Sequence, residues 1–297
     1  MKAVRLVIAA ACTFSLIAAA SAPAADAEKK PPFAVKVIGK GRPMILIPGL
    51  ACSGAVWDST VEHFKGKYEC HVLTLAGFAG QEPVASEAFL DTVRQGIAGY
   101  IRTKKLNKPV IVGHSLGGFL VFALGISDPD LVGELIAVDG LPCLPAIFND
   151  KVDADSLKKQ ADLIREGMAK APRKAFLDQS KAMLKGWISD EKLRETAEKW
   201  SEQSDQATVA RAMSELFARD LRPEVGRIKS RVLLIGAWHK AIESYGMKRD
   251  AIEKRYADQV AAVPHHKVAI ADNAKHFIMF DAPDWMFAQM DAFLAGK

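Results

Sequence analysis

The segment PVIVGHSLGGF, residues 109–119, places a serine among glycines where a β-branched apolar run ends. The apolar half is typical of a buried strand, and the glycines are typical of a turn that opens a helix. A tight bend there strains its central residue, Ser115, so Gly113 and Gly117, two positions before and after it, must lack bulk. The first-turn amides of the following helix favour negative charge. This arrangement suits a nucleophile whose attack creates an oxyanion.

Strand and helix patterns alternate along most of the chain. Apolar runs or alternation predict strands at residues 33–38, 43–47, 70–75, 109–112, 135–138, 231–235 and 267–270. Helical spacing of apolar residues predicts helices at 54–64, 86–102, 116–126, 250–261 and 284–294. This alternation indicates an α/β fold with a doubly wound, mostly parallel sheet covered on both faces. Ligands bind at the carboxyl ends of such strands, and Ser115 lies just past one.

The alternation stops between about Leu144 and Arg222, where helical patterns follow one another without a strand. Because the sheet pattern resumes at Arg231, we expect an inserted helical cap over residues 144–222. The core is then formed by residues 28–143 and 223–297. The apolar side of the cap is expected to include Met168, Met183, Trp187, Met213 and Phe217.

The sequence GHSLGG, residues 113–118, resembles the nucleophile elbow of the α/β-hydrolase superfamily, whose serine esterases and lipases often carry a helical cap. The resemblance extends from about Phe33 to the C-terminus. It includes LIPGLACSG after an early strand, LTLAGFAGQ after the next, and NAKHFIMFD near the end. It implies a catalytic Ser115 acting in acyl transfer without a metal or organic cofactor.

A serine hydroxyl needs a base within hydrogen-bond reach. His276 follows the last strand in the loop before the final helix, which is where the family places its general base. His265 and His266 stand at the wrong end of that strand, and His114 is expected to pack away from Ser115. The resemblance also implies an oxyanion hole made by the amides of Leu116 and Leu50, with Ala51 as an alternative to Leu50.

The third member of the expected triad departs from the family pattern. The family commonly supplies its acid shortly after the penultimate strand, but GAWHK, residues 236–240, has His239 at that place. Certain lipases and the haloalkane dehalogenases of this fold take the carboxylate from the strand after the elbow helix, where this chain has Asp139. The acid must orient and stabilise the imidazole and needs no fixed sequence address. We therefore expect Asp139 as the acid, with Glu243, Asp250 or no working acid as alternatives.

These residues lead to the expectation of a serine hydrolase that cleaves a carboxylic ester, or a related acyl bond, through an acyl-enzyme on Ser115. The partner would be a small-molecule or lipid-like acyl substrate, and Trp238 and His239 are candidate walls of its pocket. An acyltransferase, thioesterase or peptidase of the same fold remains an alternative, since fold does not fix substrate. So does a non-catalytic small-molecule-binding protein on a degenerate hydrolase scaffold.

The first 27 residues carry Lys2 and Arg5, an uncharged apolar run and then small residues, as in a cleaved secretory signal peptide. This predicts a periplasmic or secreted protein with no stable membrane span after cleavage. The net charge of +5 and the absence of a basic block interleaved with aromatics make nucleic acid an unexpected partner. Export would leave Cys52, Cys70 and Cys143 in an oxidising compartment, and pairing of Cys52 with Cys143 stays open.

Overall fold

The computed structural model describes residues 31–149, 151–245 and 247–296, so the expected signal peptide lies outside the described residues. Residues 31–297 form one compact unit. No helix within the described ranges combines the length and the apolar character needed to cross a membrane.

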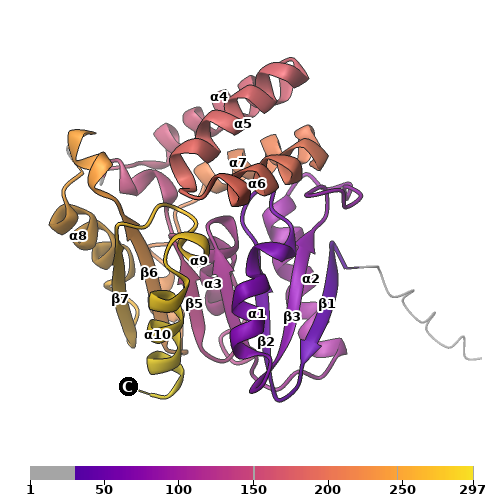
Figure 1. The fold of residues 1–297 in the computed structure, drawn as a ribbon, viewed down its shortest axis with the longest axis vertical. Coiled ribbons are helices and arrows are strands. Elements are labelled where there is room, and N and C mark those ends of the chain that lie inside the picture. The colour runs from indigo at the N-terminus through magenta and orange to yellow at the C-terminus, as the bar shows by residue number, and fades with distance from the viewer. Residues whose placement is uncertain (1–30, 150, 246, 297) are drawn as a thin grey trace, which may run out of the picture. The chain divides into compact units, whose positions relative to one another are not determined.

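A seven-stranded sheet runs through this unit in the order β1-β3-β2-β4-β5-β6-β7 (Figure 1). Only β1 runs antiparallel, against β3, and the other neighbouring pairs are parallel. The expected α/β fold with a mostly parallel sheet is therefore confirmed. The strands are β1 (Phe33–Gly39), β2 (Arg42–Ile47), β3 (Tyr68–Leu75), β4 (Val110–His114), β5 (Leu135–Val138), β6 (Val232–Trp238) and β7 (His266–Asp272).

The sheet separates two apolar cores because successive side chains of a strand point to opposite faces. In β2, Ile45 and Ile47 contribute to one core, while Met44 and Leu46 contribute to the other. The first core is covered by α2 (Phe89–Thr103), α3 (Leu116–Ser127) and α8 (Arg249–Val260). The second is covered by α1 (Asp58–Phe64), α9 (Ile278–Asp281) and α10 (Pro283–Leu294). Short 3-10 helices η1 (Gly54–Trp57), η2 (Leu144–Ile147), η3 (Val225–Arg227) and η4 (Lys240–Tyr245) lie in the connections.

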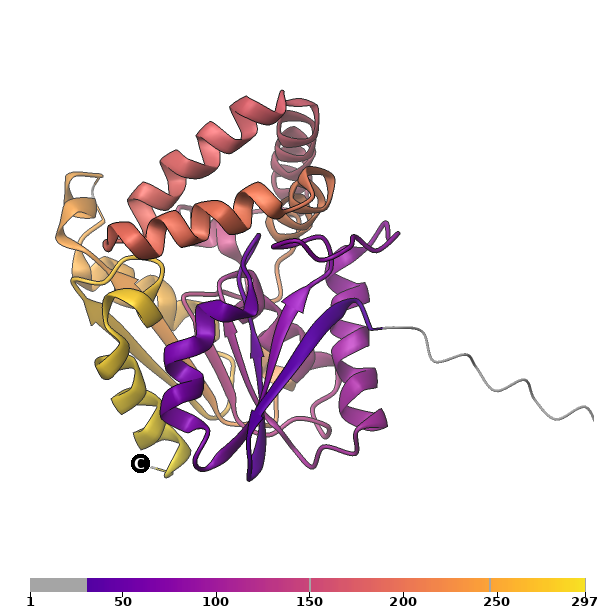
Figure 2. The same ribbon diagram turned by 45° about the vertical axis from the view of Figure 1, so that its right-hand side comes forward.

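Four helices between β5 and β6 lie over the carboxyl ends of the strands (Figures 1 and 2). They are α4 (Ala154–Lys170), α5 (Arg173–Trp187), α6 (Glu191–Gln203) and α7 (Gln206–Phe217), and together we call them the cap. Aspartates fix three of their starts: Asp153, Asp190 and Asp205 accept hydrogen bonds from first-turn amides of α4, α6 and α7. These four helices lie within the range 144–222 for which the sequence predicts helices without a strand.

Glu215 of α7 joins the cap to the core. Its carboxylate accepts hydrogen bonds from the amides of Phe89, at 2.7 Å, and Leu90, at 2.8 Å, at the start of α2. Those first-turn amides have no partner inside their own helix, so the carboxylate supplies one and interacts favourably with the helix dipole. One turn further along, Arg219 forms an ion pair with Asp91. Both contacts fix α7 against the edge of the sheet domain.

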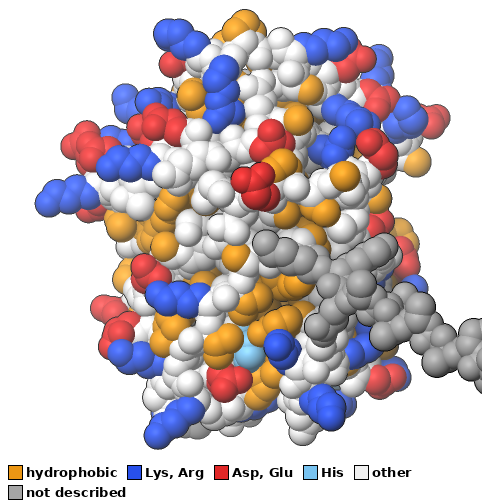
Figure 3. Space-filling view, turned by 90° about the vertical axis from the view of Figure 1, so that its right-hand side faces the viewer, with side chains coloured by type: hydrophobic (Ala, Val, Ile, Leu, Met, Phe, Trp, Pro, Cys, Tyr) orange, Lys and Arg blue, Asp and Glu red, His pale blue; other side chains and the backbone are white. Residues whose placement is uncertain are grey.

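Charged side chains of both signs are interspersed over the face shown in Figure 3. On the cap, several such charges pair along one helix, including Lys158 with Asp162 and Lys174 with Asp178. Exposed pairs of this kind contribute little to stability. On the part of this face that is drawn in colour, neither sign of charge forms a continuous patch.

Replacing Glu215 with alanine should lower the free energy of unfolding by about 1–3 kcal/mol, because two buried amides lose their acceptor. Urea unfolding followed by circular dichroism measures this change. Glu195→Ala is the matched control, since Glu195 is an exposed carboxylate on cap helix α6. Equal losses in the two variants would contradict the anchoring role of Glu215.

Candidate active site

Ser115 occupies a sharp bend between β4 and α3. Its backbone has φ 54° and ψ −117°, a conformation that L-residues rarely adopt. Its amide donates to the carbonyl of Val138 at 2.9 Å, which ties the bend to the neighbouring strand. A Cβ added at Gly113 would lie 2.1 Å from the carbonyl oxygen of Gly117, and one at Gly117 would lie 2.3 Å from that of Ile47. Both glycines are therefore required by the close approach of backbone to backbone.

The hydroxyl of Ser115 faces a cavity of about 630 Å³ that His276 and Asp139 also line. Among the described residues, no side chain or carbonyl makes a hydrogen bond to this hydroxyl. The oxygen is thus free to turn toward a ligand or toward the imidazole. The structure brings the three residues expected to form the triad to one cavity.

His276 lies in the loop between β7 and α9, and Asp139 follows β5 directly. Their side chains are only 18% and 10% exposed, and Nδ1 of His276 lies 2.5 Å from Oδ2 of Asp139. Since a carboxylate only accepts, Nδ1 is the donor in this hydrogen bond, which leaves Nε2 as the ring nitrogen that can exchange a proton with a ligand or with Ser115. Asp139 itself has φ 48°, so the chain adopts a strained backbone to bring its carboxylate to this position.

The other carboxylate oxygen of Asp139 has two donors. Oδ1 accepts from the amide of Ala237, at 3.0 Å, and from the hydroxyl of Tyr256, at 2.5 Å. Tyr256 belongs to α8 and is buried. Burial, followed by the nearby charge of Asp139, raises the pKa of Tyr256 well above its usual value, so the phenol stays protonated and donates. No pattern in the sequence pointed to this residue, because a tyrosine on a buried helix face is ordinarily explained by packing.

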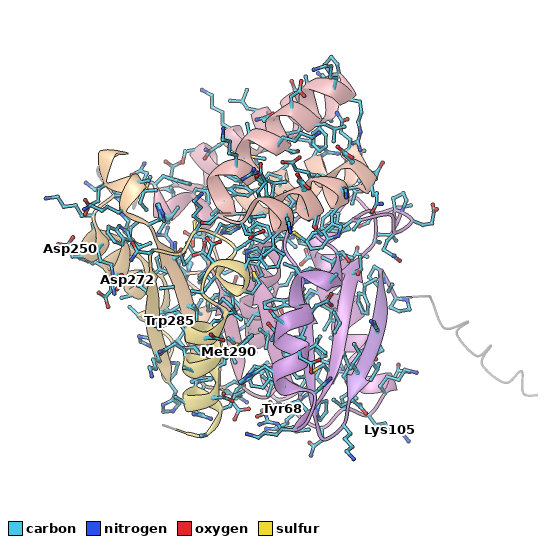
Figure 4. The ribbon with its side chains drawn as sticks, in the orientation of Figure 1. Tyr68, Lys105, Asp250, Asp272, Trp285 and Met290 are labelled. Carbon is cyan, nitrogen blue, oxygen red and sulfur yellow. The ribbon has the colours of Figure 1, made fainter. Side chains whose placement is uncertain are left out.

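The two alternative acids do not meet the imidazole. Glu243 is exposed in η4, and Asp250 is exposed near the start of α8. Figure 4 shows Asp250 at the outer side of the molecule, where its carboxylate accepts the amide of Ala251. Tyr68 and Lys105, in the same view, mark the opposite end of the sheet from the cap. Of the three candidate acids, only Asp139 contacts His276.

Among the described residues, backbone amides without a hydrogen-bond partner stand after β2 and next to Ser115 in the chain. Leu50 and Ala51, after β2, both line the cavity, and Ala51 has φ 55°. Leu116 begins α3, directly after Ser115. Within the described residues, the hydrogen bonds of turns and loops engage the amide of Cys52 but not those of Leu50, Ala51 or Leu116. All three amides are available to a ligand oxygen.

His114 packs beneath the site, as expected, and connects its two sides. Its Nε2 donates to the carbonyl of His276 at 3.0 Å, and the two rings lie 4.6 Å apart between centroids. A Cβ at Gly49 would lie 2.8 Å from Nδ1 of His114. Burial, followed by the proximity of His276, holds the pKa of His114 well below its usual value. A neutral His114 therefore braces the loop before Leu50 and the loop that carries His276.

The cap also contacts the base directly. The indole of Trp187, at the end of α5, lies 4.9 Å from the ring of His276 between centroids. Its carbonyl accepts from the amide of Phe277 at 3.2 Å. Asp281 accepts the amide and hydroxyl of Ser189 in the cap and the amide of Lys275 beside the base. The corner between α5 and α6 is thereby fixed to the loop that carries His276.

Most of the cavity lining is apolar and comes from both the cap and the sheet domain. It includes Leu141, Leu144, Met168, Met183, Trp187, Val209, Met213, Phe217 and Ile242. His239 also lines the cavity, as expected. The expectation for Trp238 is wrong, because its indole donates to the carbonyl of Met247 and packs against the sheet core, outside the lining. Successive residues at the end of β6 point to opposite sides, which separates the two.

No group of histidine, cysteine or acidic side chains within the described ranges is arranged to hold a metal ion. The cysteines that the structure describes are unpaired: Cys52, Cys70 and Cys143 are all buried free thiols. The open question of a bond between Cys52 and Cys143 is thus answered by free thiols. Burial raises the pKa of Cys52, which lines the cavity, to about 12.

Comparison with known proteins identifies the family and the fold. The model of the alpha/beta hydrolase family matches residues 44–289. The fold is similar to that of a thermophilic esterase from Thermogutta terrifontis, with a TM-score of 0.71 and 18% identity over 89% of this chain and 93% of that one. An enol-lactonase from Burkholderia xenovorans LB400 gives a TM-score of 0.70 at 17% identity over 89% and 96%. A strand, elbow and cap arrangement of this kind defines a capped α/β-hydrolase fold, and the chain belongs to the alpha/beta hydrolase family.

Among curated proteins, the chain is 32% identical over 108 residues to a pimeloyl-[acyl-carrier protein] methyl ester esterase from Aliivibrio fischeri strain MJ11. That match covers 36% of this chain and 40% of the relative's length. A protein of the same description from Nitrosomonas europaea is 24% identical over 71% of this chain and 82% of its own length.

The buried thiols should resist alkylation while the protein is folded. At pH 8 a Cys52 thiol with a pKa of about 12 is almost entirely protonated, and the thiolate is the reactive form. Iodoacetamide followed by peptide mapping should leave Cys52, Cys70 and Cys143 unmodified in buffer and alkylate them in urea. Detection of a Cys52–Cys143 cross-linked peptide in unreduced protein would contradict the free-thiol structure.

Proposed function

We propose that this protein is a serine hydrolase that cleaves carboxylic esters with an apolar acyl group. Ser115 is the nucleophile, His276 the general base and Asp139 the acid that orients it. The amides of Leu116 and Leu50 form the oxyanion hole, with Ala51 beside them.

In the first half of the reaction, Oγ of Ser115 attacks the ester carbonyl carbon while its proton passes to Nε2 of His276. The carbonyl oxygen becomes an oxyanion, which the Leu116 and Leu50 amides stabilise at the start of α3. Collapse of this intermediate breaks the bond to the alkoxy oxygen, and His276 gives that oxygen the proton. The alcohol leaves, and the acyl group remains on Ser115.

In the second half, a water molecule attacks the acyl-enzyme and gives its proton to His276. The second tetrahedral intermediate collapses, the bond to Ser115 breaks, and Ser115 recovers its proton as the carboxylic acid is released. Throughout, Asp139 holds the imidazole in one tautomer and stabilises its positive charge. Neither half requires a metal or an organic cofactor.

The hydrogen bond between Asp139 and His276 is the observation that carries this proposal. A buried carboxylate with a strained backbone, paired with an imidazole on the cavity that Ser115 faces, is the arrangement that activates a serine. The alternative of a non-catalytic binding protein was based on His239, which stands where the family usually has its acid. Asp139 beside His276 takes away that basis. A protein that only bound a ligand would gain nothing from the strained elbow.

The cavity supports an apolar acyl group of moderate size. Its volume of about 630 Å³ lies in the range of roughly 300–1,000 Å³ that is common for small-molecule sites. Away from the proposed triad its lining is mostly apolar, and its polar side chains include Ser180, Ser201, His239 and Lys275. The curated relatives, described as esterases of an acyl methyl ester, support ester cleavage as the reaction. A periplasmic or secreted location, with a lipid-like substrate met there, is part of the same proposal.

A panel of p-nitrophenyl esters of increasing acyl length should be hydrolysed by the full-length protein, and Ser115→Ala should abolish this turnover. A fluorophosphonate should label the wild type and not the variant, as shown by the mass of the peptide that contains residue 115. Turnover by Ser115→Ala at the wild-type rate would refute the proposed enzyme, whatever the substrate.

Substituting Asp139 with asparagine should lower kcat by roughly 10⁴-fold, since the imidazole loses both its fixed tautomer and the charge that stabilises it. Glu243→Gln and Asp250→Asn are the matched controls and should retain wild-type kcat, because both carboxylates are exposed and away from His276. If Glu243→Gln lost activity while Asp139→Asn kept the wild-type kcat, the acid would be Glu243 in η4 and not Asp139.

A further inference from the structure

Tyr256 is a buried polar group that the proposed mechanism does not use. Its hydroxyl lies 2.5 Å from Oδ1 of Asp139, while Oδ2 of the same carboxylate contacts His276. The two oxygens of Asp139 are thus divided between different partners. We infer that Tyr256 is a positioning residue that fixes the rotation of the Asp139 carboxylate and tempers the proton affinity of the Asp139–His276 pair. This inference rests on the proposed function, since it concerns the same site.

The carboxylate has a defined pair of donors on one oxygen. The amide of Ala237 approaches Oδ1 at 3.0 Å from the end of β6, and the Tyr256 hydroxyl approaches it from α8. A carboxylate group can rotate about the bond that joins it to Cβ. Two donors from different elements on Oδ1 resist this rotation more than the Ala237 amide alone. With Oδ1 fixed in this way, Oδ2 stays directed at Nδ1 of His276.

Strand β6 packs closely against the ring of Tyr256. A Cβ added at Gly236 would lie 2.5 Å from Cε1 and 2.7 Å from Cδ1 of Tyr256, so only a glycine lets the ring lie against β6. Tyr256 is 5% exposed and its ring packs in the sheet core, which holds the hydroxyl in place. The residues after β6 do not supply the acid in this chain. Instead, β6 and α8 supply the two donors that hold an acid coming from β5.

The hydroxyl also changes the electrostatics of the pair. A donor to Oδ1 takes up part of the negative charge of Asp139, so less of it is available to stabilise the imidazolium. Removal of the donor concentrates the charge and raises the affinity of His276 for its proton. Removal of the charge itself, as in Asp139→Asn, has the opposite effect.

Few other groups of the described residues can titrate next to this pair. His114, from β4, contacts His276 and is held neutral by its burial. His239, after β6, and Lys275, beside the base, line the same cavity. None of these three side chains has a described hydrogen bond to Asp139, whereas Tyr256 donates to it.

Tyr256→Phe tests the inference, because it removes the hydroxyl and keeps the ring against Gly236. The probes are p-nitrophenyl butyrate turnover and the rate of fluorophosphonate labelling, both followed from pH 5 to 9 in the full-length protein. We expect kcat to fall about tenfold, the size of a lost hydrogen bond to a charged group. The acid limb of kcat/KM and of labelling, which reports the base in the free enzyme, should move to higher pH. In Asp139→Asn the same limb should move to lower pH.

Tyr100→Phe is the matched control. It also removes a tyrosine hydroxyl, one that is partly buried and contacts Nδ1 of His71 at 2.8 Å, away from the cavity. Urea unfolding should show a comparable loss of stability in the two variants, whereas only Tyr256→Phe should change kcat and the pH limb. An unchanged kcat and limb in folded Tyr256→Phe, with Asp139→Asn inactive, would overturn the inference and leave the proposed function intact. Wild-type turnover by Ser115→Ala would instead overturn the proposed function.

Discussion

The site depends on the hydrogen bond between Asp139 and His276, two residues that are 137 positions apart in the chain. A buried carboxylate is costly unless it is paired and hydrogen-bonded. Here it is satisfied from β6, from α8 and from the loop after β7, so its burial requires that all these elements be in place. The parallel pairing of β5 with β6 and of β6 with β7 brings their carboxyl ends to the same edge of the sheet. The site therefore forms only when the sheet and α8 are folded, because the hydrogen bonds of Asp139 come from several of their elements.

Much of this architecture was predictable because its causes are local. Continuous apolar runs predicted the strands, and glycines at fixed distances from Ser115 predicted the elbow, since a side chain there would collide with backbone. The expected role of His276 came from the family resemblance, which implies a general base in the loop after the last strand. The long stretch without a strand pattern predicted helices between β5 and β6, because strand and helix differ in apolar periodicity.

The parts that were not predictable depend on contacts between distant segments. Asp139 was chosen by resemblance to other branches of the fold, and the sequence alone left Glu243 and Asp250 open. Tyr256 lies on a helix that the sequence predicted, but its donor role exists only where β5, β6 and α8 meet. Trp238 and His239 are adjacent in sequence, yet only the second lines the cavity, since the direction of each side chain is set by the register of β6.

The attachment of the cap beside His276 restricts how the cap can move relative to the sheet. Phe277 and Asp281 hold the turn after α5, and Trp187 lies on the imidazole itself. If the cap moved outward at that turn, His276 would lose these contacts when a ligand enters the cavity. Phe148, just after η2, borders the cavity and is 61% exposed, so the cavity wall reaches solvent at a place other than the turn that supports the base.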